Sequence, residues 1–485
     1  MSYPSSDSSS EVSLALIYAL GSNAQPYFDT SALCTNIANF PEVRGLVIGL
    51  GKSFNGLGAG MYAALFQGFF SVPGEPGNLH SAVRFIGLLS GLQLGIPLVS
   101  LFILRRLPRA LVDEANSRPG ARVFRTKRIA FGYAVTIFLS LYLTGTALAE
   151  NLVPDMPSHT RLGFTLGALG VTSLFLYIPM GKVDTRSTTT AGSASAPLVI
   201  AAQDVALERS LLAEEDTAGG DGEESGAEDS EAENLSLRRI LLQPTLWSFF
   251  FIIFVVSGCG LMVINNVTQI ALALDGGHRT NATHPASRAM GRDDAKQGHA
   301  AGTAVFVSLI AVSNCFGRLL MGVLLNRCKR WTSPRGLLML DVSVMLFAFL
   351  VLSQATYGML YFGIPVVGLT FGGVWALLPA LCAETYGTTH LGAIYNFLNF
   401  APMASSFVLA SKIPGTLYDS QAARAGTGNQ CFGLVCYQTA FYINAACLAA
   451  AVTVNMCRLC ASRSWRCPWR GKLHAAQNTH RASGP

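Results

Sequence analysis

The feature that most constrains this chain is a series of long apolar stretches, five before residue 182 and six after residue 243. An α-helix rises about 1.5 Å per residue and the hydrocarbon core of a bilayer is about 30 Å thick, so about 20 apolar residues cross it. A soluble fold of this length does not need so many such stretches. The sequence therefore predicts an all-α polytopic membrane protein with about 11 transmembrane helices.

The predicted spans form two blocks. Those of the first block cover residues 12–38, 43–71, 82–104, 128–151 and 160–181. Those of the second block cover residues 244–274, 302–326, 335–354, 357–383, 389–411 and 435–458. The first span is the weakest, because Pro26 and Asp29 interrupt a short apolar run.

Composition agrees with a membrane protein. Only 13% of the residues are charged and 51% are hydrophobic, whereas soluble domains carry about 25% charged residues. Twelve acidic residues and one basic residue, Arg209, lie between Asp204 and Glu233. Removing them from the 34 basic and 28 acidic residues leaves 33 and 16. The basic residues are spread over loops rather than gathered on one face, so we expect no nucleic-acid partner.

These patterns predict four regions. Residues 1–181 form an N-terminal helical block of about 5 spans, and residues 244–458 form a C-terminal six-helix block. Residues 182–243 form an acidic loop that we expect to be disordered, because it has too few apolar residues to bury a core. Residues 459–485 form a basic tail.

Loop charges predict the orientation. Basic residues cluster in the segments 105–128, 327–335 and 458–472, which all fall on one side of the predicted spans. Positive loops face the cytosol, so we expect the C-terminus and the acidic loop there, in the plasma membrane or an endomembrane. The loop 275–301 then lies outside and carries the glycosylation sequon Asn281-Ala282-Thr283. Chance is the alternative explanation, since sequons are common.

The predicted number of spans is odd, so a cytosolic C-terminus places the N-terminus outside. Yet residues 1–11 lack the basic region that begins a cleavable signal peptide. We therefore expect an odd number of helices to be missing before the first span.

Several short motifs along the chain are informative. The most specific is Asn39-Phe40-Pro41-Glu42-Val43-Arg44-Gly45. The others are Gly21-Ser22-Asn23-Ala24-Gln25, Gly49-Leu50-Gly51-Lys52, Gly258-Cys259-Gly260-Leu261, Gly317-Arg318-Leu319-Leu320-Met321-Gly322 and Glu384-Thr385-Tyr386-Gly387. Together they resemble the nodulin-like branch of the major facilitator superfamily. The resemblance implies a two-block helical bundle that moves a small solute by alternating access. It also implies that further helices precede the first span, so an inactive, shortened relative is an alternative.

Lys52 lies inside the second span, where an ionisable group is costly and usually faces a cavity or a partner. Lys52, Asn55 and Gln67 share a face rich in small residues. On one interpretation this face lines a solute pathway, and Lys52 offers positive charge to an anionic solute. Its other candidate partners are Asp29 and the carbonyls of a helix end. On the other interpretation, Lys52 extends to the cytosolic edge and the glycines only permit close packing.

Polar residues in later spans have the same two interpretations. Asn266 and Gln269 lie in the sixth span, and Tyr395, Asn396 and Asn399 in the tenth. Such side chains line water-filled cavities or form hydrogen bonds between helices. Together with Lys52, Asn55 and Gln67, they are the candidate pathway residues.

A second group resembles the facilitator loop signature, in which small residues let helices approach and an acid–base pair closes the cytosolic gate. It comprises Arg44, Gly317, Arg318, Gly322, Asn326 and Arg327. Asn326 stands where the signature has Asp, so this latch would lack its charge. Alternatively, the basic residues only set the orientation.

The sequence contains no catalytic constellation and no strong metal-ligand spacing, so we expect no enzyme activity, no cofactor and no metal. Cys431 and Cys436 fall on the predicted exterior side, where they can form a disulfide. The expected partners are a small solute and the lipid bilayer. A secondary-active transporter is the preferred function, and a non-transporting membrane sensor or scaffold is the alternative.

Overall fold

The computed structural model describes residues 26–70, 79–103, 107, 112, 121–153, 156–178, 237–281, 292–328, 331–387, 390–426 and 430–461. Within these ranges the regular structure is helical. The candidate pathway and gate residues all belong to this part of the chain. The acidic segment before residue 237 and the tail after residue 461 lie outside it.

Helices of the first block begin with residues 26–39, which precede the short 3₁₀ turn η1 (Pro41–Val43). The longer ones are α2 (Arg44–Phe69), α3 (Leu79–Ile103), α5 (Ala121–Leu152) and α6 (Ser158–Ser173), which η2 (Leu174–Tyr177) extends.

The second block begins with the short helix α8 (Leu237–Leu241). Its other elements are α9 (Pro244–Asn281), α10 (Arg292–Arg327), α11 (Pro334–Leu352), η5 (Tyr357–Met359), α12 (Leu360–Tyr386), α13 (Leu391–Leu398), α14 (Phe400–Ser405), the π-helical segment η6 (Ser406–Lys412), α15 (Ile413–Ala425) and α16 (Val435–Ala461).

Each predicted span contains helix, but several helices extend further than the apolar runs. Helix α9 continues to Asn281 and α10 begins at Arg292, so the predicted loop 275–301 is shorter than expected. Helix α15 continues the tenth span to Ala425, and α8 forms at the end of the predicted acidic loop. The physical reason is that a helix satisfies its own backbone hydrogen bonds, so it need not end where the apolar residues end.

The protein is an integral membrane protein. Eight helical segments in the described residues are long and apolar enough to cross a bilayer. The helix 26–39 and α6 are not among them because they contain fewer than 18 residues in the described part. Glycine-rich α2, with Arg44 and Lys52, is not among them either. The number of about 11 spans therefore remains a prediction.

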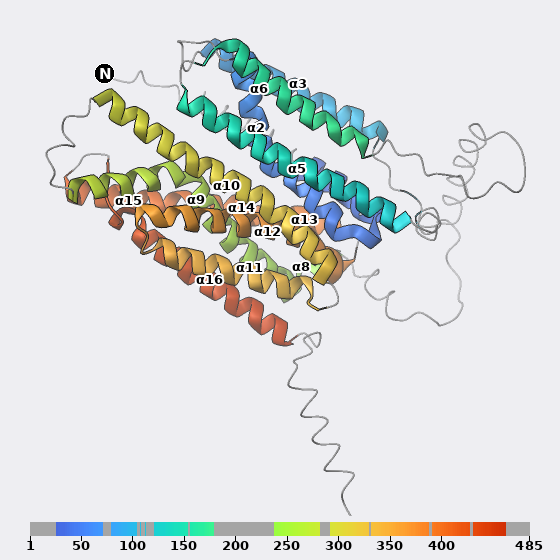
Figure 1. The fold of residues 1–485 in the computed structure, drawn as a ribbon. Helices are drawn as coiled ribbons and strands as arrows, with labels where there is room; N and C mark the ends of the chain where they lie inside the picture. Colours follow the sequence, from blue (N-terminus) through green and yellow to red (C-terminus); the bar gives the residue numbers. More distant parts are fainter. Residues whose placement is uncertain are drawn as a thin grey trace, which may run out of the picture. The chain divides into compact units, whose positions relative to one another are not determined.

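Helix α10 packs against α2 and α5 of the first block and against α12 of the second (Figure 1). Glycines make the contact with α2 close. A Cβ added to Gly49 would lie 2.8 Å from the Cα of Gly322, and one added to Gly45 would lie 2.9 Å from the Gly322 carbonyl oxygen. These small residues let two backbones meet, as in other membrane helix pairs.

On its other side, α10 meets α12 in the same way. A Cβ added to Gly317 would collide with the carbonyl group of Leu369, and one added to Gly372 would collide with that of Asn314. Glycines on both faces thus let α10 pack closely against helices of both blocks. This packing brings polar residues of distant segments together.

Candidate functional site

Lys52 is the centre of the candidate site. It lies about two turns inside α2 and its side chain is only 1% exposed. Its ammonium forms an ion pair with the carboxylate of Asp29 from the helix 26–39. It also donates a hydrogen bond of 2.6 Å to the hydroxyl of Tyr395 in α13, and its nitrogen lies 4.6 Å from the centre of that ring. A buried ammonium needs such partners, because removing a charge from water costs several kcal/mol.

Asp29 is the more accessible member of the pair. Its side chain is 28% exposed. Its second carboxylate oxygen accepts a hydrogen bond of 3.4 Å from the amide of Asn55, one turn after Lys52 on α2. The hydroxyl of Tyr395 lies 3.5 Å from the other carboxylate oxygen. The anion of the cluster is therefore open on one side while the cation is enclosed.

Arg318 of α10 adds a second cation. Its side chain is 6% exposed, and it donates a hydrogen bond of 2.6 Å to the backbone carbonyl of Lys52. It also donates to the side-chain oxygen of Asn314 at 3.1 Å. Arg318, Lys52 and Asp29 interact electrostatically with one another. Among the described residues, this cluster therefore has two cations and one carboxylate, which is an excess of positive charge.

A further contact joins the helix 26–39 to α13. Thr30 is buried and donates a hydrogen bond of 2.7 Å to the side-chain oxygen of Asn396. A Cβ on Gly392 would lie 3.4 Å from the methyl carbon of Thr30. Tyr395 and Asn396 thus bind adjacent residues of one helix of the first block.

Of the other pathway candidates, Asn399 contacts the cluster, because it donates to the carbonyl of Tyr395 within its own helix at 3.0 Å. Gln67 lies about 22 Å from Lys52 along α2. Asn266 donates to the carbonyl of Met262 and, at 3.2 Å, to that of Ala410 in η6. The Ala410 contact links α9 to the π-helical segment.

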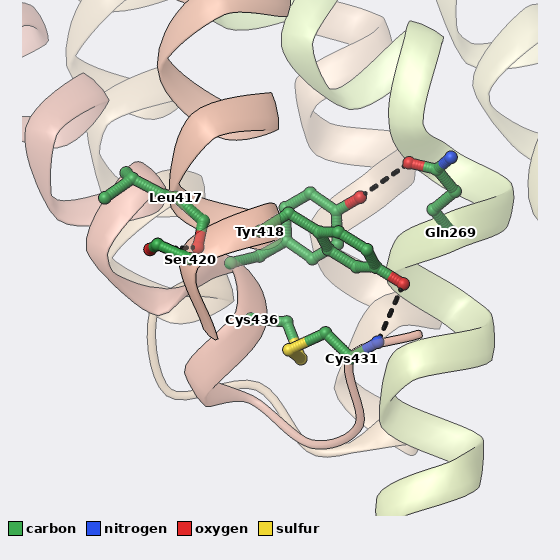
Figure 2. The surroundings of a disulfide bond; sticks show 7 residues. Gln269, Leu417, Tyr418, Ser420, Cys431 and Cys436 are labelled. Atoms are coloured by element: carbon green, nitrogen blue, oxygen red, sulfur yellow. Dashed lines mark hydrogen bonds between the residues drawn. A yellow bond between two sulfur atoms is a disulfide. The ribbon is translucent and has the colours of Figure 1, made fainter. Parts of the chain in front are cut away.

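Gln269 accepts a hydrogen bond of 2.9 Å from the hydroxyl of Tyr437, close to the disulfide between Cys431 and Cys436 (Figure 2). The hydroxyl of Tyr418 accepts a hydrogen bond from the backbone N–H of Cys431 in the same region (Figure 2). The disulfide that the sequence suggested is formed. Gln269 thus contributes to the contact between α9 and α16.

The signature residues divide into two sets. Gly317, Arg318 and Gly322 lie inside α10 and contact α12 or α2, whereas Asn326 and the exposed Arg327 lie at its end. Arg44 begins α2, and electrostatic attraction links it to Glu384 near the end of α12. Opposite charges of the two blocks therefore attract one another here, although Asn326 does not contribute to this attraction.

Asp29, Thr30 and Asn314 are site residues that the sequence did not predict, although Asp29 was one candidate partner of Lys52. An acidic residue within a predicted span was the available signal for Asp29. Neither Thr30 nor Asn314 has a distinctive local pattern. In the described part of the chain, no three His, Cys, Asp or Glu side chains gather as metal ligands would.

Comparison with known proteins identifies the first block. Residues 7–180 match the family model described as Nodulin-like. Over these residues the resemblance to the nodulin-like family is confirmed. The match includes the helix 26–39 and α2, and therefore both members of the ion pair.

Two other proteins are similar over parts of the chain. A Candida glabrata protein named "Probable transporter MCH1" is 25% identical over 248 residues, which are 47% of this chain and 45% of that protein. The alignment thus spans about half of that relative. A crystal structure of the E. coli fucose:proton symporter aligns over 90% of this chain and 99% of its own, with 14% identity and a TM-score of 0.33.

Proposed function

We propose that this protein is a secondary-active transporter that moves a small anionic solute by alternating access. Residues 1–181 and 244–458 are the two helical blocks, and the cluster around Lys52 is the solute site. The observation that carries this proposal is the enclosed ammonium of Lys52, which contacts Asp29 of the first block and Tyr395 of the second. A nodulin-like first block and a relative named as a probable transporter support it.

The chemistry favours an anionic solute. Lys52 and Arg318 together exceed the charge of Asp29, so a second anion would be stabilised at the cluster. Asp29 is part-exposed, and its other contacts are two long hydrogen bonds, from Asn55 at 3.4 Å and from the hydroxyl of Tyr395 at 3.5 Å. A solute carboxylate would take the place of Asp29 on Lys52 and accept the hydrogen bonds that Asp29 accepts now. Such an exchange keeps Lys52 paired with an anion, while the released Asp29 carboxylate, which is 28% exposed, is solvated by water.

Alternating access requires the two blocks to change their contacts around the site. Lys52 donates to Tyr395, and Thr30 donates to Asn396, so both contacts join the blocks at α13. When a solute displaces Asp29 from Lys52, the helix 26–39 loses its ion pair with α2 and keeps the hydrogen bond from Thr30 to Asn396. Solute binding would in this way be coupled to movement of one block against the other.

Uptake into vesicles tests the proposal. Purified protein in liposomes is supplied with a panel of short labelled carboxylates and with uncharged amides of the same size. We expect uptake of at least one carboxylate, its loss in Lys52→Ala and partial recovery in Lys52→Arg. Lys412→Ala is the control, because Lys412 is exposed in η6. Normal uptake by Lys52→Ala would remove Lys52 from the site.

The rival function is a non-transporting membrane sensor or scaffold. A sensor or scaffold would contain the same ion pair, which would then serve only to hold helices together. In that case no member of the panel enters wild-type vesicles, and Lys52→Ala lowers only the stability of the protein. An inactive relative would give the same result.

A further inference from the structure

A second buried ionisable group lies in the C-terminal block, apart from the Lys52 cluster. Asp341 is in α11 and is 4% exposed. It lies on the buried face of this helix, together with Leu338, Val342 and Met345. Helix α11 is one of the segments able to cross a bilayer. Asp341 therefore faces the interior of the helix bundle.

Close packing encloses its carboxyl group. One oxygen lies 2.5 Å from the position that a Cβ on Gly373 of α12 would take, so this glycine makes room for the carboxyl. The terminal methyl of Met321 from α10 lies 3.1 Å from the same position. The other oxygen of Asp341 is buried and has no hydrogen-bond partner among the described residues.

Charged groups of the surrounding helices are engaged elsewhere. Arg318 of α10 binds the carbonyl of Lys52, and Arg335 of α11 donates to Thr385. Glu384 of α12 and Arg458 of α16 lie in the last turns of their helices. The distance from Gly373 to Glu384 along α12 is about 16 Å.

An ionised carboxylate at this position would lack both water and a counter-ion. The free-energy cost of such a charge is large, and a buried group avoids it by remaining neutral. A neutral carboxylic acid carries a proton that it can release once water or a cation reaches it. Asparagine has nearly the same shape and cannot do this, so ionisation is what distinguishes an aspartate here.

We propose that Asp341 is a proton-binding site of the C-terminal block, and that its proton is the ion coupled to solute movement. This inference rests on the transport function proposed above. In the described conformation Asp341 holds the proton. When a change of conformation lets water reach the carboxyl, the proton leaves on that side. One proton then crosses with each anionic solute, and the pair carries no net charge.

The first test observes the proton directly. Infrared spectra of purified protein in lipid nanodiscs are compared between wild type, Asp341→Asn and Asp419→Asn at neutral pH. Asp419 is the control, because it is exposed on α15. We expect a carboxylic-acid carbonyl band that shifts in deuterated water, that Asp341→Asn lacks and that Asp419→Asn retains. If Asp341→Asn instead loses an ionised-carboxylate band, the proton site is wrong.

The second test measures coupling in vesicles with a solute that wild type transports. An inward proton gradient of one pH unit should drive about tenfold accumulation. Asp341→Asn should lose this accumulation but retain exchange of labelled for unlabelled solute, which needs no net proton release. Accumulation that persists in Asp341→Asn would overturn the coupling. A wild type that moves no solute would overturn the transport function and the coupling with it, while the infrared band still decides the proton site.

Discussion

The hydroxyl of Tyr395 accepts a hydrogen bond of 2.6 Å from the ammonium of Lys52, although 343 residues separate them in sequence. Lys52 belongs to α2 and Tyr395 to α13, so this contact joins the two helical blocks. It also explains how α2 can bury a lysine. The aromatic ring and the Asp29 carboxylate together replace the water that the ammonium loses.

Tyr395→Phe should destabilise the protein while retaining the ring contact. The change removes a hydrogen bond to a charged group, which contributes about 1.5–3 kcal/mol. We expect a lower midpoint in thermal unfolding of the detergent-solubilised protein. Tyr361→Phe is the matched control, since Tyr361 packs its ring on Phe306 and is about half exposed. Equal midpoints for the two variants would show that the Tyr395 hydroxyl contributes nothing.

Single changes in the ion pair should destabilise the protein more than the double change does. Asp29→Asn leaves the buried ammonium of Lys52 without its counter-ion, and Lys52→Met leaves the carboxylate of Asp29 without its cation. Removing one partner of a buried pair costs about 3–5 kcal/mol, and the exposure of Asp29 makes this an upper limit. The double variant should recover part of the loss, as unfolding measurements on all four proteins would reveal. Strict additivity would mean that the pair is not coupled.

Gly49→Ala should weaken the contact between the blocks. The added Cβ would lie 2.8 Å from the Cα of Gly322 and 3.0 Å from the carbonyl oxygen of Arg318, which are backbone atoms that cannot turn aside. Gly51→Ala in the same helix meets nothing within 4 Å and is the control. We expect a lower unfolding midpoint for Gly49→Ala, and an unchanged or higher one for Gly51→Ala because alanine favours helix. The reverse order would contradict the close packing of α2 and α10.

The C-terminus and residues 182–243 should lie in the cytosol, because the basic loops share that side. Protease added to sealed right-side-out vesicles should leave tags at both places intact, and permeabilised vesicles should lose them. Cleavage of the loop tag in sealed vesicles would reverse the orientation.

Asn281 should carry any N-linked glycan, because it is the last residue of α9 and its sequon lies on the predicted exterior side. Asn281→Gln should abolish a glycosidase-sensitive shift in gel mobility. Asn234→Gln is the control, since its sequon lies on the predicted cytosolic side. A shift that survives Asn281→Gln but not Asn234→Gln would also reverse the orientation.

The sequence by itself determined that this chain is a helical membrane protein, because a run of about 20 apolar residues has few other stable environments. It also determined the nodulin-like resemblance through local motifs such as Asn39-Phe40-Pro41, and it identified Lys52 because a lysine inside an apolar helix is costly. These inferences depend on residues close together in the chain.

Only the tertiary structure decided which partner Lys52 takes. Asp29, a helix end and a solute were all consistent with the sequence, and the choice depended on how α2, the helix 26–39 and α13 pack. Packing likewise placed Asn266 and Gln269 at contacts between helices, and it enclosed Asp341 against Gly373. Side-chain partners that lie hundreds of residues apart leave no local pattern, because their proximity arises only when glycine-lined helices approach one another.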